Sequence, residues 1–421
     1  MIKIIIINHT FQKAEFCKRW SVFAQKHKDV DVTLLAPAEW TWGGDRGLTY
    51  GHVEVLKGKE EANDNFRIRL IDIEKNSRGD WTSKGFEQQI KEIEPDIVYY
   101  IGGHNNLALM TLYQIKKKLR MPKMKILVFS MRGKSHGLEL QRSKFIVKQL
   151  KYIAKYCIFK KRLNKLNKNT QAIFCHFPVA VEEFRREGFK GPIYMQTQVG
   201  VDPDIFYPNE TSREKIRNKY NIGDAYLFGS ASRFDRAKGL IEIIRALPEQ
   251  GNWKYLMMGW GRDDEVELIK EEIAKRGLQD KIILTGFIDN WTDMAEHWNA
   301  LDCAVHAPLT TKLWEETFSL ALVQAMATGL PVIGSSSGSV PYQIGQDGII
   351  VPEGDVEQMR NQMLRCMSNP DWAKEIGLKM KERAVNCFGI YHLTELFYLT
   401  IKDIINDKYD FNKSDMATFK I

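Results

Sequence analysis

The loop 229–240 places two of its cations, Arg233 and Lys238, beside the start of an expected helix. An apolar strand ends near Gly229, and a helix begins near Lys238. The first turn of a helix offers unpaired N–H groups and partial positive charge, so Arg233 and Lys238 there favour binding of a diphosphate. When this loop is considered alone, a cationic surface turn explains it equally well.

A second segment, 314–333, joins two acids to an apolar helix and a buried strand. Glu315 and Glu316 precede the helix. Its apolar face consists of Leu320, Val323 and Ala327. Because free N–H groups at a helix start stabilise carboxylates, a simple helix-start acid is the plainer interpretation of both glutamates.

Other candidate motifs do not support phosphate or metal chemistry. The run 132–135 contains Gly-Lys-Ser, but Val128 stands where a phosphate-binding P-loop needs glycine. The run 259–261 has only two glycines and predicts a tight turn, and the Asp-Pro-Asp run 202–204 is typical of turns. The sequence contains no H-E-x-x-H or C-x-x-C motif, so we expect no metal site.

Short apolar runs must position these loops, and they alternate with helical patterns along the chain. The expected strands are 3–7, 32–35, 66–71, 97–101, 126–129, 172–175, 193–196, 226–229, 255–258, 282–284, 303–306 and 331–333. This alternation predicts parallel sheets with crossover helices, an α/β architecture. Ligands of such sheets bind at the carboxyl ends of the strands.

The run 200–208 interrupts this rhythm with one glycine and two prolines. We place a domain boundary there, between domains of about 200 residues that face each other across a cleft. A periodic segment, 391–405, predicts a C-terminal helix, and the polar tail that follows is expected to fray. The domains are therefore 1–200 and 201–390, with 391–421 as helix and tail.

Length and composition exclude several classes of protein. The chain has 421 residues, of which 44% are hydrophobic and 27% charged, enough for a large core. Its apolar runs are shorter than the roughly 18–20 residues of a membrane-spanning helix, and the first is too short for a signal peptide. Six widely spaced cysteines fit reduced thiols, so we expect a cytoplasmic protein.

Positive charge is concentrated in residues 116–168. This segment contains 18 Lys or Arg residues and one acid, Glu139, whereas the whole chain has a net charge of +8. Basic and apolar residues recur at helical spacing over 144–157, which predicts one helix with a basic and an apolar stripe. The segment favours an anionic partner such as lipid head groups or a phosphate-bearing polymer.

Together, the loop 229–240 and the run from Glu316 to Val332 resemble the retaining glycosyltransferases of family 4, which have the two-domain GT-B fold. The second run reads E-T-F-S-L, then Q-A-M-A-T-G-L-P-V. The linker 200–208 and the runs 258–261, 284–287 and 301–303 are also similar to the family pattern. The resemblance covers most of 195–355 and implies two Rossmann-like doubly wound domains, with a C-terminal helix that crosses back to the first.

The resemblance implies transfer of a sugar, with retention, from a nucleotide-diphosphate donor, for which we expect a UDP-sugar and no metal. Arg233 and Lys238 would stabilise the diphosphate, and Glu316 would contact the donor sugar. The base would be read by the backbone near Phe287 and Ile288. The remaining residues of the implied donor site are Thr317, Phe318, Ser319, Leu320 and Gln324.

Two positions depart from the family pattern. Gln324 replaces a glutamate that holds the ribose, and Ser319 replaces a glycine. A neutral hydrogen bond contributes roughly 1 kcal/mol less than a charged one, so we expect about five- to tenfold weaker donor binding. Ser319 can still offer its N–H if its conformation does not require glycine.

The first domain is expected to bind the acceptor. His9, His104 and His136 lie in loops that follow candidate strands, and we rank His104 first for moving the acceptor proton. Ordinary loop histidines are the plainer interpretation of each. Trp42, Asp45 and Arg46 suit sugar or phosphate recognition, and a packed tryptophan beside a turn explains them equally well.

We therefore expect a hexosyltransferase that acts on an anionic or lipid-linked glycan, at the inner face of the membrane through 116–168. Three alternatives remain: a sugar-nucleotide epimerase of the same fold, a non-catalytic carbohydrate-binding or partner-binding protein, and an enzyme that glucosylates nucleic acid. Arg233, Lys238 and Glu316 favour transfer over epimerisation. Gln324 prompts the non-catalytic alternative, and only the net charge prompts the nucleic-acid one.

Overall fold

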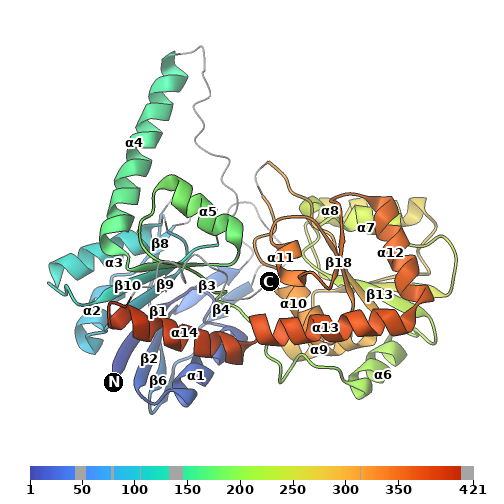
Figure 1. Ribbon diagram of the computed structural model, residues 1–421, viewed down its shortest axis with the longest axis horizontal. Coiled ribbons are helices and arrows are strands. Elements are labelled where there is room, and N and C mark those ends of the chain that lie inside the picture. Colours follow the sequence, from blue (N-terminus) through green and yellow to red (C-terminus); the bar gives the residue numbers. More distant parts are fainter. Residues whose placement is uncertain (43–53, 77–79, 105, 132–145, 313, 409–421) are drawn as a thin grey trace. The chain divides into compact units, whose positions relative to one another are not determined.

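The computed structural model describes residues 1–42, 54–76, 80–104, 106–131, 146–312 and 314–408. They form two compact units, each with its own sheet and core (Figure 1). Unit 1 comprises Met1–Thr41, Val55–Gln198 and the segment from Thr394 onward. Among the described residues, unit 2 comprises Val199–Leu393 together with Trp42 and Glu54.

The sheet of unit 1 has the strand order β12-β11-β10-β9-β1-β2-β6-β5. Its strands are β1 (Ile2–Ile7), β2 (Val30–Pro37), β5 (Glu61–Asn63), β6 (Phe66–Ile71), β9 (Ile97–Ile101), β10 (Lys125–Phe129), β11 (Ala172–Cys175) and β12 (Ile193–Met195). Neighbours are parallel except β5 and β6. Two small sheets pair β3 (Glu39–Trp42) with β4 (Glu54–Lys57) and β7 (Glu74–Lys75) with β8 (Trp81–Thr82).

The sheet of unit 2 is parallel throughout, with the order β15-β14-β13-β16-β17-β18. Its strands are β13 (Tyr226–Ala231), β14 (Trp253–Met258), β15 (Ile282–Gly286), β16 (Cys303–His306), β17 (Val332–Ser335) and β18 (Ile349–Val351). Because a parallel strand is covered on both faces, it needs a continuous apolar run, as in the fully buried Ile4–Ile7 of β1. Both sheets confirm the predicted α/β class.

Helices connect most of these strands. Unit 1 has α1 (Ala14–Lys26), α2 (Gly85–Ile93), α3 (Leu107–Lys118), α4 (Ile146–Asn169) and α5 (Pro178–Glu187). Unit 2 has α6 (Glu210–Lys219), the 3-10 turn η2 (Arg236–Lys238), α7 (Leu240–Ala246), α8 (Asp263–Lys275), α9 (Trp291–Ala300), α10 (Leu320–Ala327), α11 (Val340–Ile344), α12 (Val356–Ser368) and α13 (Pro370–Phe388). The helix predicted in the basic segment is α4.

The C-terminal helix α14 (Ile390–Ile405) joins the core of unit 1. Phe397, Ile401 and Ile404 are fully buried there at helical spacing, whereas Leu399 faces solvent. The prediction that this helix packs back on the first domain is therefore confirmed. In the described part of the chain, no helix combines the length and the apolar character needed to cross a bilayer.

Strand order locates one topological switch point in each unit. In unit 1 the chain goes from β1 to β2 on one side and later returns to β9 on the other. In unit 2, β14 and β16 flank β13 in the same way. Loops diverge at such points and leave room for a ligand at the carboxyl ends of the strands. The cleft expected between the domains stays a prediction.

Candidate functional site

The loop after β13 is built around Asp235. Its Oδ1 accepts a hydrogen bond from the N–H of Ala237 at 2.9 Å, which caps the η2 turn. Its Oδ2 accepts one from Nη2 of Arg233 at 3.0 Å. One carboxylate therefore shapes the turn and holds the Arg233 guanidinium, which is about one quarter exposed, at the carboxyl edge of the sheet.

The start of α7 lies against the end of β16. The N–H of Leu309 donates to the carbonyl of Ala237 at 2.8 Å. Gly239 has φ +67°, and a Cβ there would lie 1.9 Å from the carbonyl oxygen of Ala307. Only glycine combines this conformation with so close an approach. The contact brings Lys238 to the loop that follows β16.

The loop after β14 supports the same edge from the other side. The N–H of Phe234 donates to the carbonyl of Trp260 at 2.9 Å, and a Cβ on Gly261 would lie 2.2 Å from the carbonyl oxygen of Phe234. Gly259 has φ +133° and approaches the carbonyl of Ser232 as closely. The predicted tight turn, 259–261, therefore packs against the loop that carries Arg233 and fixes its position.

Lys238 and Glu316 meet at the switch point of unit 2. Nζ of Lys238 lies 2.6 Å from Oε2 of Glu316, and Nε2 of His306, the last residue of β16, lies 3.5 Å from the same oxygen. The Lys238 ammonium also lies 4.4 Å from the ring centroid of Trp314, a cation–π contact. Lys238 and His306 thus both approach a single carboxylate, and the Trp314 ring contacts the Lys238 ammonium.

Glu316 is buried, with 5% of its surface exposed. Burial by itself would raise the pKa of this carboxyl. The approach of His306 and the charge of Lys238 outweigh burial and lower the pKa to about 2. A buried ion pair is often no more stabilising than well-packed apolar side chains, and perturbed groups cluster at functional sites. We therefore take this cluster as the candidate site.

The backbone of Glu316 is held by the turn before α11. Its carbonyl accepts a hydrogen bond from the N–H of Ser339 at 2.7 Å, and a Cβ on Gly338, at φ +48°, would lie 2.0 Å from that oxygen. Glu316 is therefore not a simple helix-start acid, since α10 begins later, with Ser319 as its N-cap. The carboxylate is instead directed at Lys238.

Ser319 adopts a conformation open to any residue, at φ −102° and ψ 110°. Its hydroxyl accepts a hydrogen bond from Leu322 at 3.2 Å, and its N–H donates to Oε1 of Gln343 at 2.9 Å. This N–H, which we expected to be available to a ligand, therefore already donates a hydrogen bond within the protein. Gln324 is buried on α10, and Thr317, Phe318 and Leu320 are half-buried.

The remaining expected donor residues follow β15. Phe287 is 57% exposed, whereas Ile288 packs against the core of unit 2. Gly286 just before them has φ +77° and accepts a hydrogen bond from the N–H of Gly259 at 3.0 Å. This backbone therefore reaches the same sheet edge as the Arg233 loop.

In unit 1, His9 and His104 follow β1 and β9, the two strands of its switch point. Nδ1 of His104 lies 2.9 Å from Oγ of Ser130, at the end of β10. The ring of His9 lies 4.6 Å from that of Trp40, which also contacts Lys75. Trp42 ends β3. The other acceptor candidates, Asp45, Arg46 and His136, lie outside the described residues.

Sequence reasoning assigned no role to His306 or Trp314. His306 was only the end of an expected strand, and Trp314 only a neighbour of the glutamates. A histidine at the carboxyl end of a strand beside the switch point is a usable signal, but strand order was needed to recognise it. Within the described residues, no group of three His, Cys, Asp or Glu side chains could hold a metal ion.

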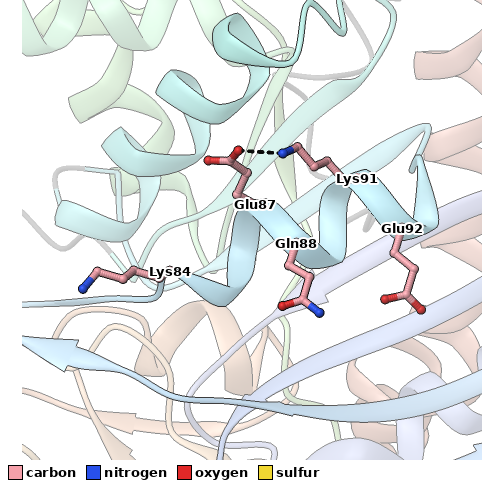
Figure 2. A pocket seen from close by; sticks show the side chains of 5 residues that line it. All are labelled: Lys84, Glu87, Gln88, Lys91 and Glu92. Carbon is pink, nitrogen blue, oxygen red and sulfur yellow. Dashed lines mark ion pairs between the residues drawn. The ribbon is translucent and has the colours of Figure 1, made fainter.

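A shallow hollow over α2 is lined by Lys84, Glu87, Gln88, Lys91 and Glu92 (Figure 2). Its charges are neutralised by one another and by their neighbours. Glu87 lies 3.0 Å from Lys91 and 2.8 Å from Lys118, and Glu92 lies 2.8 Å from Arg69. Lys84 pairs with Glu74 at 2.8 Å. We assign no function to this surface.

Comparison with known proteins matches residues 212–384 to the family model described as glycosyl transferases group 1. A GDP-mannose-dependent alpha-(1-6)-phosphatidylinositol monomannoside mannosyltransferase of Mycolicibacterium smegmatis is 26% identical over 44% of this chain and 50% of its own length. An amylovoran biosynthesis glycosyltransferase of Erwinia amylovora is 31% identical over 40% of each chain. The chain thus spans half or less of the length of these curated relatives.

Solved structures match almost the whole chain. Sucrose-phosphate synthase from Thermosynechococcus elongatus superimposes with a TM-score of 0.66 at 17% identity, over 97% of this chain and 100% of the other. An Anabaena protein solved in complex with UDP and glucose gives 0.65 at 15% identity, over 96% and 100%. At these identities the likeness establishes the fold, which is GT-B.

Proposed function

Because the chain belongs to the group 1 glycosyltransferases, we propose that it is a retaining hexosyltransferase that uses a nucleotide-diphosphate sugar. The observation that carries this proposal is the buried Lys238–Glu316–His306 cluster at the switch point of unit 2, inside the segment that matches the family model. It supplies both positive and negative groups where a sugar diphosphate would bind.

Cleavage of the donor leaves an additional negative charge on the diphosphate. Arg233 and Lys238 stabilise that charge in our proposal, so Lys238 exchanges Glu316 for phosphate oxygens when the donor binds. The released Glu316 carboxylate then accepts hydrogen bonds from donor-sugar hydroxyls or faces the developing positive charge. Gln324 holds the ribose, and the backbone at Phe287 and Ile288 contacts the base.

The donor base is proposed by analogy. One relative is named for GDP-mannose and one structural neighbour contains UDP-glucose, and we propose a UDP-sugar as the first candidate. Arg233, Lys238 and the start of α7 provide the positive charge that a divalent metal provides in metal-dependent transferases, so we propose transfer without a metal.

Unit 1 binds the acceptor in this proposal, with His104 taking the acceptor proton. The relatives' names point to a phosphatidylinositol mannoside and to the polysaccharide amylovoran. We propose an anionic or lipid-linked glycan acceptor and a cytoplasmic enzyme. In the described part of α4, exposed Lys160, Lys161 and Arg162 support contact with an anionic membrane.

The first test is a thermal-shift measurement with UDP, GDP, ADP and dTDP, followed by the corresponding sugar conjugates, each with and without EDTA. A ligand at one hundred times its Kd adds about 2.7 kcal/mol of stability. One nucleotide with a clear shift unaffected by EDTA is expected. No shift with any of them, in a folded sample, would favour the non-catalytic carbohydrate-binding or partner-binding alternative.

The second test separates chemistry from binding. Arg233→Ala should lower kcat, because it removes charge stabilisation that grows as the diphosphate leaves. Lys270→Ala, which removes an exposed lysine on α8, is the matched control and should leave kcat and KM unchanged. An effect of Arg233→Ala on KM alone would rule out the leaving-group role.

A further inference from the structure

A hollow of about 580 Å³ lies between α7, α8 and α12 of unit 2. It is lined by Arg245, Glu249, Glu272, Lys275, Arg276, Val356 and Arg360. Four cations and two acids leave this surface a net positive charge of two. None of these side chains has a role in the proposed transfer reaction.

One of the two acids is already fully engaged. Glu272 accepts hydrogen bonds from Nε and Nη2 of Arg245 at 2.9 and 3.0 Å, a bidentate pair. The other, Glu249, is 76% exposed and lies 4.0 Å from Arg360, the limit of an ion pair. The positive charge of Lys275, Arg276 and Arg360 is therefore only weakly compensated.

Two arginines in the hollow also have buried N–H groups without an acceptor. Nε of Arg276 and Nε of Arg360 are both buried and have no hydrogen-bond partner within the described residues. The Arg276 side chain forms no hydrogen bond or ion pair with that part of the chain, and Arg360 donates through Nη2 to the carbonyl of Arg245 at 2.6 Å. Buried donors without partners are uncommon and call for an explanation.

The charges that line the hollow over α2 are paired, in contrast to those between α7, α8 and α12. Over α2, each lysine and glutamate of the lining has an opposite charge within 3.0 Å. Figure 2 shows one of these pairs, Glu87 with Lys91. Between α7, α8 and α12, by comparison, cations converge on a concave surface whose acids do not balance them. Guanidinium groups match the oxygens of phosphate in geometry as well as in charge.

We propose that the hollow between α7, α8 and α12 is a second anion-binding site, which takes a phosphate-bearing small molecule through Arg276 and Arg360. The volume accommodates a phosphorylated sugar as well as free phosphate. The site is separate from the Lys238 cluster, although α7 connects them: Lys238 precedes this helix and Arg245 lies in its last turn.

Calorimetric titration of the full chain with inorganic phosphate and with a hexose 6-phosphate, at constant ionic strength, tests the proposal. Arg276→Gln and Arg360→Gln should each weaken binding by at least about tenfold, since each removes a charged hydrogen bond. Arg276→Lys, which keeps the charge but loses the fork, should give an intermediate loss. Two controls, Lys270→Gln on the same helix and Arg233→Ala at the donor site, should change affinity by less than about twofold.

If the hexose phosphate binds, and the Arg276 and Arg360 variants but not the controls lose affinity for it, the site takes a phosphorylated sugar. If only inorganic phosphate binds with these losses of affinity, the site is supported with free phosphate as its ligand. The proposal is overturned if neither anion binds saturably, or if Lys270→Gln weakens binding as much as Arg276→Gln. Loss of binding in Arg233→Ala alone would assign the phosphate to the donor site instead. Unfolding midpoints of all variants confirm that they are folded.

Discussion

Replacing Lys238 with alanine should expose the energetic role of the buried cluster. The variant leaves the Glu316 carboxylate with the favourable approach of His306 alone among the groups shown to lower its pKa in the described chain, in a site where burial disfavours its charge. The pKa shift from 4.5 to about 2 corresponds to about 3 kcal/mol of net favourable interaction with the ionised form. Removal of one partner from a buried pair typically costs about 3–5 kcal/mol, and we expect a loss in that range at pH 7.

Adding Glu316→Gln to Lys238→Ala should recover part of this loss, because the stranded charge is removed. Urea unfolding of the wild type, both single variants and the double variant gives the coupling free energy, for which we expect about 2–3 kcal/mol. The exposed Lys270–Glu267 pair, at 2.7 Å against 2.6 Å for Lys238–Glu316, is the control cycle and should couple by less than about 1 kcal/mol. If the Lys238–Glu316 coupling is below about 0.5 kcal/mol, the cluster is not the buried electrostatic unit described above.

Three further predictions concern the same unit. Gly239→Ala should destabilise the chain by more than Gly277→Ala in urea unfolding. Both glycines have positive φ, but a Cβ at 239 would meet the carbonyl of Ala307, whereas a Cβ at 277 would meet no atom within 4 Å. Equal losses of stability would contradict the close approach of Gly239 to Ala307. The folded-state pKa of Glu316 lies below its ordinary value. Its stabilising contribution is therefore present above pH 4.5 and is lost as the pH falls towards about 2. The free energy of unfolding of Glu316→Gln should accordingly differ less from that of the wild type at pH 3 than at pH 7. Gln324→Glu should tighten donor binding about five- to tenfold in calorimetry, whereas a large gain in turnover would indicate a decayed site rather than a tuned one.

The expected strands are all present because each is a short apolar run bounded by turn residues. β1 and β9 are buried along most of their length, and this burial is visible in composition alone. Sequence reasoning missed β3, β4, β5, β7, β8 and β18, which have two to four residues each. The exposed β5 is an example, since polar residues in so short a run leave no periodic signal.

The candidate site was found only in part. Arg233, Lys238 and Glu316 were recognised because their types and local context suggest anion chemistry. Their contacts were not predictable, because Lys238 and Glu316 lie 78 residues apart and meet only through the order of the strands. For the same reason His306 was overlooked, and the plainer helix-start interpretation of Glu316 was wrong.

The sequence by itself determined the α/β class, most strands of both sheets and the chemistry available in two loops, because apolar periodicity and residue type are local properties of the chain. Only the tertiary structure decided that Lys238 is paired with Glu316, that the N–H of Ser319 donates to Gln343, and that cations converge between α7, α8 and α12. These features depend on distances of a few ångströms and on burial, and both arise only when segments far apart in the chain pack together.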